Sequence, residues 1–202
     1  MPNYNPLYVN GVERTLNTAT SQHARLSTFR VDLHFPLDRT GRRDELVISR
    51  FFDSLKYHLS ALIERKRNDG LTCHNRTAMH YIWCREYGPV NGNRHYHVML
   101  MLNKDVFCFL GNLQLLPDQY SSLANLIQRA WCSALKLRVE CYAHLAHFPD
   151  CAVTWIERNS PHFSEQMKIV RYRAMYLAKT ASKQIGNGRS FGSSQPSPSL
   201  IG

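Results

Sequence analysis

Two histidines one residue apart begin a strongly apolar run in the stretch NRHYHVMLMLN, residues 93–103. On a β-strand, side chains alternate between the two faces, so His95 and His97 project together, roughly 7 Å apart. Two neutral imidazoles at this spacing can bind one divalent metal ion, although two ordinary hydrogen-bonded histidines near a strand end give the same pattern. The spacing therefore predicts a candidate metal site and leaves the plain structural interpretation open.

Glu86 is the candidate third ligand, because it ends the apolar segment before the turn GPVNGN, residues 88–93. If the hairpin pairs Glu86 with His95, the carboxylate lies on the histidine face, whereas a slip of one residue puts Arg85 there. Two imidazoles and one carboxylate leave positions on a metal open for a phosphate oxygen and water. A simple surface carboxylate remains the alternative.

The segment RYRAMYLAKTASK, residues 171–183, places Tyr172, Tyr176 and Lys179 at positions i, i+4 and i+7 of a predicted helix. A phenol with an ordinary pKa of about 10 is a poor nucleophile unless a neighbouring cation or metal favours the phenolate. Tyrosines at helical spacing usually serve packing, but the basic residues around this stripe suit a phosphodiester better than a core. We interpret the two tyrosines as candidate nucleophiles and the lysine as their companion.

The charge balance favours a polyanionic partner. The chain of 202 residues carries 25 Lys+Arg against 15 Asp+Glu, a formal net charge of +10, and neutralising phosphates releases their counterions. We expect contacts to DNA from five basic residues near the proposed site in sequence: Arg94, Arg171, Arg173, Lys183 and Arg189. No apolar run reaches the ~18 residues of a membrane span, the N-terminus lacks a signal-peptide pattern, and the scattered cysteines suit reduced thiols, so we expect a cytoplasmic protein.

The elements that must position these residues follow from periodicity. Alternation predicts strands at 25–36, 78–87 and 94–103, a weaker one within 137–147 and another at 151–156. Helical spacing predicts helices at 44–66, 119–135 and 164–183. We expect one domain at 25–186, between a flexible arm at 1–24 and a disordered tail at 187–202. This order predicts the α+β class: a single central antiparallel sheet of about five strands, two helices on one face, and the last helix on the other.

These motifs resemble those of a known superfamily. HYH is similar to the His-hydrophobic-His motif of the HUH endonucleases, and YRAMYLAK to the Y-x-x-x-Y-x-x-K helix of two-tyrosine rolling-circle replication initiators. The stretches REYGPVNGNRHYHVMLMLNKD, YLAKT and RSFG resemble inovirus-type replication proteins of phages and prophages, the YagK/YfjJ C-terminal domain family. The resemblance covers most of the chain, from Phe29 to Phe191.

The resemblance implies a reaction and a set of roles. His95, His97 and Glu86 would bind Mg²⁺ or Mn²⁺, and Tyr172 and Tyr176 would alternate as nucleophiles with Lys179 beside them. The family reaction nicks one strand of an origin, forms a 5′-phosphotyrosine and leaves a 3′-OH that primes synthesis. The implied partners are single-stranded origin DNA and, since the sequence has no P-loop pattern, a separate helicase and DNA polymerase in a bacterial host.

Two other functions fit the same motifs. A relaxase or single-strand transposase uses the same metal and tyrosine chemistry, and a DNA-binding protein that has kept the fold needs no catalysis. His34 lies in the first predicted strand, where it could approach the site, and we expect that it does not bind the metal.

Overall fold

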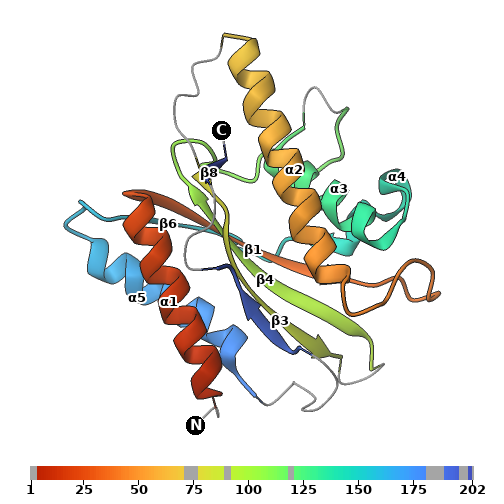
Figure 1. Cartoon of the computed structure of the whole chain (residues 1–202), viewed down its shortest axis with the longest axis horizontal. Coiled ribbons are helices and arrows are strands. Elements are labelled where there is room, and N and C mark those ends of the chain that lie inside the picture. Colours follow the sequence, from red (N-terminus) through yellow and green to blue (C-terminus); the bar gives the residue numbers. More distant parts are fainter. Residues whose placement is uncertain are drawn as a thin grey trace.

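The computed structural model describes residues 4–70, 77–88, 92–117, 121–180, 189–195 and 200–201. Its centre is an antiparallel sheet with the strand order β5-β1-β4-β3-β7, in which β6 also pairs with β1 (Figure 1). The sheet strands are β1 (Arg25–His34), β3 (His80–Tyr87), β4 (Arg94–Asn103), β5 (Ala146–His147), β6 (Val153–Glu157) and β7 (Phe191–Ser193). A separate pair is formed by β2 (Thr77–Ala78) and β8 (Leu200–Ile201).

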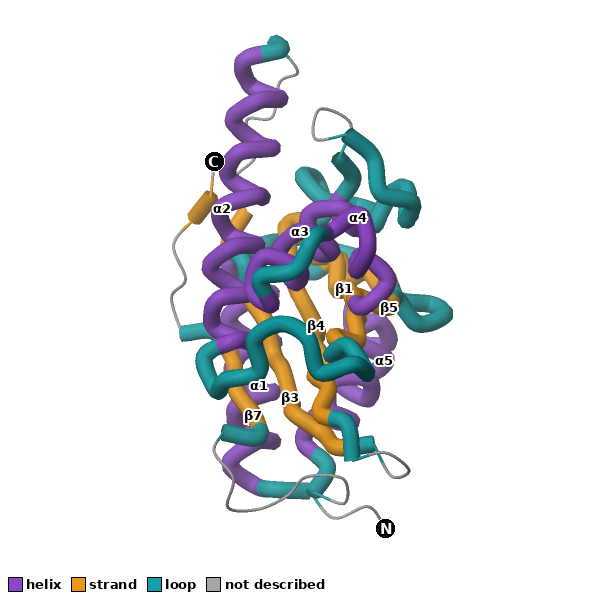
Figure 2. The backbone as a smooth tube through the Cα atoms, turned by 90° about the vertical axis from the view of Figure 1, so that its right-hand side faces the viewer, coloured by secondary structure: helices purple, strands orange, loops and turns teal. Residues whose placement is uncertain are grey.

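The helices lie on both faces of this sheet (Figures 1 and 2). They are α1 (Pro6–Gln22), α2 (Val47–Asn68), α3 (Leu123–Leu135), α4 (Val139–Tyr142) and α5 (Phe163–Met175), with 3-10 turns η2 (Ala143–Leu145) and η3 (Tyr176–Ala178). The predicted α+β class, with an antiparallel sheet of about five strands, is confirmed. None of the helices within the described ranges has the length and apolar character that crossing a bilayer requires.

Helices α2 and α3 cover one face, as predicted, and enclose the larger core. Tyr96, Val98, Leu100 and Leu102 of β4 point into it, because alternate residues of a strand share a face. Trp131 of α3 is fully buried there, and its indole N–H donates to the main-chain oxygen of His34 at 2.7 Å. This layer fixes the sheet from the side opposite the histidine pair.

The first 24 residues are not the flexible arm that we predicted. From Pro6 to Gln22 they form α1, which packs with α5 on the second face of the sheet. Asn5 caps the helix by accepting from the amide of Leu7, and Pro6 suits the first turn. The many Asn and Thr residues, which are weak helix formers, concealed a buried stripe at Val12, Leu16 and Ala19.

The predicted tail also contains structure, so the prediction of disorder is wrong for its described residues. Phe191–Ser193 form β7, which pairs with β3 at the edge of the sheet. A Cβ on Gly192 would lie 2.6 Å from the Trp83 ring, so only glycine allows this close approach. The rest of 187–202 lies outside the described residues, apart from Arg189, Ser190, Ser194, Gln195 and β8.

The segment 137–147 is mostly helical rather than a strand. Only Ala146 and His147 pair with β1, while 139–145 wind into α4 and η2 against α3. Lys136 turns the chain with a left-handed φ of 58° directly after α3. Packing against the neighbouring helix thus overrides the weak strand pattern. The predicted strand at 151–156 is confirmed as β6.

Two predicted helix boundaries differ from those observed. Asp44 and Glu45 precede α2 rather than forming its first turn, and Asp44 instead accepts from the amide of Leu46. Helix α5 ends at Met175, well before the predicted Lys183. The helix predicted at 119–135 ends at Leu135 as expected, and its predicted start at 119 lies outside the described residues.

If α1 is an integral part of the fold, Leu16→Ala will lower the free energy of unfolding by about 2–5 kcal/mol, because it leaves a cavity where a leucine is 0% exposed. Leu7→Ala is the matched control, since Leu7 lies on the same helix and is 76% exposed. Urea unfolding of both variants measures the difference. Equal stability of the two variants would show that the N-terminal segment contributes no core.

Candidate active site

The pairing register decides which side chains share the second face of the sheet. Residue His95 of β4 lies opposite Glu86 of β3, and His97 lies opposite Asp32 of β1. The predicted pairing of Glu86 with His95 is therefore the one observed. Arg85 points to the other face of the sheet. Because side chains on directly paired residues lie close together, the sheet gathers imidazoles and carboxylates at one end of three adjacent strands.

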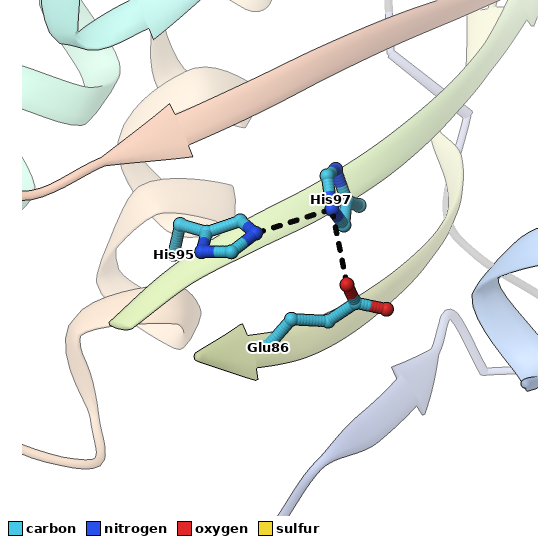
Figure 3. A group of neighbouring side chains, drawn as sticks. All are labelled: Glu86, His95 and His97. Carbon is cyan, nitrogen blue, oxygen red and sulfur yellow. Dashed lines mark hydrogen bonds and ion pairs between the residues drawn. The ribbon is translucent and has the colours of Figure 1, made fainter. Parts of the chain in front are cut away.

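Three of these side chains face one point. Nε2 of His95 lies 3.2 Å from Nε2 of His97, and Nε2 of His97 lies 3.4 Å from Oε2 of Glu86 (Figure 3). One donor atom from each residue falls within 4.8 Å of the other two. Glu86 is buried, at 5% exposed, while both histidines are half-buried, so the group opens to solvent on the histidine side.

The outer ring nitrogens fix the orientation of both imidazoles. Nδ1 of His97 donates to Oδ1 of Asp32 at 2.6 Å, and Nδ1 of His95 donates to the main-chain oxygen of Asn93 at 3.3 Å. An acceptor at Nδ1 requires that this nitrogen carries the proton, which leaves Nε2 as the metal-binding atom. Metal-ligating histidines are held in this way by a carboxylate or a carbonyl oxygen. Asp32 is therefore a supporting residue for the site.

The charges around His97 favour a cation at this point. Burial lowers the pKa of His97, but the hydrogen bonds and negative charges of Asp32 and Glu86 outweigh burial and raise the pKa to about 9. The second proton on this ring points from Nε2 toward Glu86 and His95, where a metal ion would be bound. Two imidazole nitrogens and one carboxylate oxygen suit a divalent ion such as Mn²⁺, Fe²⁺ or Mg²⁺. They leave coordination positions open for an oxygen ligand.

Tyr176 is the tyrosine that reaches this group. Its ring meets the His97 ring edge-on, with centroids 5.9 Å apart, and remains 40% exposed. Two cations flank the ring: Nζ of Lys179 lies 4.5 Å from its centroid, and the guanidinium carbon of Arg30 lies 5.7 Å away. Burial and the neighbouring Glu86 raise the pKa of Tyr176, so the phenol is protonated in the metal-free protein.

Tyr172 is not part of the same contact. Its ring is 81% exposed and extends into solvent one helical turn before Tyr176. The predicted continuous stripe ending at Lys179 is wrong in detail, because Tyr176 begins a 3-10 turn and Lys179 is extended. The helix ends here since the N-terminus pairs with it: the amide of Asn5 donates to the main-chain oxygen of Ala178 at 3.2 Å.

The predicted DNA-binding arginines have structural partners. The Arg94 side chain, 12% exposed, contacts Glu45 at 3.1 Å and lies over the Phe35 ring at 4.6 Å, which favours a positioning role. Arg171 pairs with Glu13 of α1 at 2.8 Å. Their role in binding DNA stays a prediction.

The other three predicted DNA contacts differ in their surroundings. Arg173 donates to Oγ1 of Thr154 at 2.8 Å, at the sheet edge beside α5. The guanidinium carbon of Arg189 lies 5.6 Å from the centre of the Trp83 ring, and Lys183 lies outside the described residues.

Arg30 and Asp32 are the site residues that sequence reasoning missed. Both lie in the strand FRVDLH, whose polar residues Arg30, Asp32 and His34 alternate with buried apolar ones. That alternation carried the signal, but only pairing with β4 shows that these polar residues share the histidine face. The His34 ring stacks beside His95, with centroids 5.7 Å apart. It is not one of the three clustered donors, and our expectation that His34 does not bind the metal stays a prediction.

Comparison with known proteins places these features in a family. The model of the YagK/YfjJ C-terminal domain family matches residues 3–194. The uncharacterized protein YagK of Escherichia coli (strain K12) is 34% identical over 198 residues, covering 93% of this chain and 92% of that protein. The uncharacterized protein YfjJ of the same organism is 30% identical over 200 residues, covering 94% of both. No solved structure matches the chain significantly.

Removal of the supporting carboxylate will weaken metal binding. Asp32→Asn keeps the shape of the side chain but loses the charge that orients His97, so we expect Mn²⁺ affinity to fall about 10–100-fold. Asp53→Asn is the matched control, because Asp53 is an exposed residue on α2. Isothermal titration with Mn²⁺ measures both. Unchanged affinity in Asp32→Asn would contradict a metal site that uses His97.

Metal affinity will also depend on pH above neutrality. The folded protein holds a proton on His97 below pH 9, so binding must displace that proton, and affinity will rise about tenfold per pH unit between pH 6.5 and 8.5. Titrations with Mn²⁺ under nitrogen test this slope. An affinity that levels off above pH 7, as an ordinary histidine pKa of about 6.5 predicts, would contradict the strongly anionic surroundings of His97.

Proposed function

The chain belongs to the YagK/YfjJ C-terminal domain family, and we propose that it nicks and joins single-stranded DNA through a tyrosine nucleophile in a metal-dependent reaction. One observation carries the proposal: the ring of Tyr176 lies against His97, one of three residues whose donor atoms face a single point. A phenol beside an open metal-binding group suits attack on a phosphodiester. A packing tyrosine needs neither the histidine pair nor the carboxylate.

The proposed reaction assigns a task to each residue. His95, His97 and Glu86 would hold the ion, Mg²⁺ or Mn²⁺, which would polarise the scissile phosphate and offset its charge. Oη of Tyr176 attacks the phosphorus and gives up its proton to water, while the bond from phosphorus to the 3′-oxygen breaks and that oxygen takes up a proton from water. The products are a 5′-phosphotyrosine and a strand that ends in a 3′-OH.

Lys179 and Arg30 supply positive charge beside the phenol. Both cations lie within 6 Å of the ring centre, where they favour the phenolate over the phenol and can attract the phosphate. The positive charge of these two residues opposes burial and the charge of Glu86, which together raise the pKa of Tyr176. We infer that a bound metal would supply further positive charge and so favour the phenolate.

The biological role that we propose is initiation of rolling-circle replication of a phage or prophage element. The free 3′-OH primes a polymerase, and a separate helicase opens the duplex. Tyr172 is the candidate second nucleophile, because it lies one helical turn from Tyr176 and its ring is free of the core. It would have to move toward the metal-binding group to cleave the regenerated origin. The same chemistry would serve a relaxase or single-strand transposase.

The test is a covalent adduct on denaturing gels. Candidate origin oligonucleotides are incubated with Mn²⁺ or with EDTA, and we expect a protein–DNA band only with the metal. Tyr176→Phe will reduce its rate of formation at least about 10³-fold, because the attacking oxygen is absent. Tyr172→Phe will retain the first cleavage, and Tyr57→Phe, which changes an exposed tyrosine on α2, is the matched control.

Each outcome decides between the functions. His97→Ala should abolish the adduct while leaving most DNA binding intact, since the phosphate contacts are electrostatic. DNA binding without any adduct, across a pool that contains the cognate origin, would leave a non-catalytic DNA-binding protein. Transfer of the covalently bound strand to a second oligonucleotide, giving a stable joined product without any DNA synthesis, would favour a transposase or relaxase.

A further inference from the structure

A pocket of about 680 Å³ adjoins the candidate metal centre, and its lining includes His95 but not Tyr176. His95 and His34 form one of its walls, and the loop after β1 forms another through Phe35 and Leu37. Tyr142 of α4 contributes to the third wall. The volume falls within the roughly 300–1,000 Å³ of small-molecule sites, which accommodates a nucleotide. None of its lining residues is used by the chemistry proposed above except His95.

Five of the twelve residues that line the pocket carry flat rings: His34, Phe35, His95, Tyr142 and His144. The His34 ring is exposed and lies parallel to the His95 ring within 22°. The exposed His144 ring stands beside the Tyr142 ring, with centroids 6.4 Å apart and planes 26° apart. Leu37 adds an apolar surface that is 78% exposed. Exposed rings and apolar groups around a cleft suit a nucleobase, because every base has a stacking face.

Positive charge gathers behind one wall. Arg39, Arg43 and Arg94 lie close enough for burial and mutual repulsion to lower the pKa of Arg43. Arg43 and Arg94 both lie over the Phe35 ring, while Arg39, which follows the lining residue Asp38 in the sequence, is exposed. Asp38 opposes them, but its carboxylate accepts from both the amide and the hydroxyl of Thr40. An exposed arginine beside a ring-lined cleft suits the phosphate of a bound nucleotide.

The order of the groups across the site gives the strand a direction. Tyr176 contacts His97, His97 contacts His95, and His95 lines the pocket. In phosphoryl transfer the attacking and leaving oxygens stand roughly in line on opposite sides of the phosphorus. If Tyr176 attacks from its side, the leaving 3′-oxygen points toward the pocket. The nucleotide that carries this oxygen is the one on the 5′ side of the scissile phosphate.

We propose that this pocket binds the base of the nucleotide immediately 5′ of the scissile phosphate. The proposal rests on the nicking function proposed above and adds a binding site for the leaving strand. When the bond from phosphorus to the 3′-oxygen breaks, its electron pair stays on that oxygen, which takes up a proton to become the 3′-OH. The pocket then holds the new 3′ end beside the phosphotyrosine, where it can either be extended or rejoin.

The test uses an oligonucleotide that the adduct assay has shown to be cleaved. One version has an abasic site directly 5′ of the scissile phosphate, and a matched version has it directly 3′. We expect the 5′ abasic site to slow adduct formation about 10–100-fold, the effect of losing one stacked base. The 3′ abasic site should have a much smaller effect.

Protein variants provide the complementary arm. Tyr142→Ala and Leu37→Ala remove pocket surface on two separate walls, and they should weaken binding of the 5′ product oligonucleotide, measured by fluorescence anisotropy in EDTA. Leu37 is exposed, so Leu37→Ala should fold normally. It therefore keeps the test valid even if Tyr142→Ala destabilises the protein. Tyr57→Ala, on α2 and outside this pocket, is the matched control that should bind normally.

The outcomes separate this proposal from the one on which it rests. A metal-dependent adduct that is indifferent to both abasic sites overturns the pocket assignment and leaves the nicking function standing. Greater sensitivity to the 3′ abasic site overturns the proposed direction of the strand. Failure of the wild-type protein to form any adduct overturns the nicking function, and the pocket assignment falls with it.

Discussion

Strand β4 lies between β1 and β3, and the candidate site depends on the register of these two pairings. Residues of β4 alternate between the covered core under α2 and α3 and the face that carries His95 and His97. With this register, the carboxylates of Glu86 and Asp32 reach the same histidine from opposite neighbours. A slip of one residue on either side would replace a carboxylate with a side chain from the opposite face. The large aromatic core makes such a slip costly, since it would turn apolar residues toward solvent.

Electrostatics then determines what this end of the sheet can accept. Two carboxylates next to a half-buried imidazole stabilise positive charge, which is why the pKa of His97 rises to about 9 despite burial. The same negative groups, together with burial, disfavour the phenolate of Tyr176 and raise its pKa. The negative charge of Glu86 and Asp32 contributes to both effects, raising the pKa of His97 against burial and that of Tyr176 together with burial. A divalent ion bound there would satisfy the carboxylates and reverse the penalty on the phenolate.

Helix α1 links the N-terminus to the position of the tyrosine. Glu13 pairs with Arg171 on α5, and the backbone of Asn5 bonds to that of Ala178. Tyr4 also forms a bridge with Lys179, which draws the chain out of the helix. Lys179 is extended at this point, and its Nζ lies 4.5 Å from the centroid of the Tyr176 ring. The segment predicted to be a flexible arm therefore contacts the residues that follow α5, next to the proposed nucleophile Tyr176.

The sequence alone determined much of the site. The period of two in β4 placed His95 and His97 on one face, and the turn signal at 88–93 defined the hairpin that brings Glu86 opposite His95. The resemblance to the YagK/YfjJ C-terminal domain family was also visible in the motifs. Local patterns suffice for these features because strand alternation and turn chemistry act over only a few residues.

Tertiary structure decided the rest. Asp32 and Arg30 belong to a strand about 65 positions away from the histidines, and no local pattern reports which distant strand will pair with β4. The packing of α1 and β7 depends on buried contacts that outweigh weak helix propensity and a Gly- and Ser-rich composition. Tyr172 and Tyr176 look equivalent in the sequence, but only Tyr176 lies against His97, whereas Tyr172, one helical turn earlier, is 81% exposed. Long-range pairing and burial, which single-sequence periodicity does not contain, make that distinction.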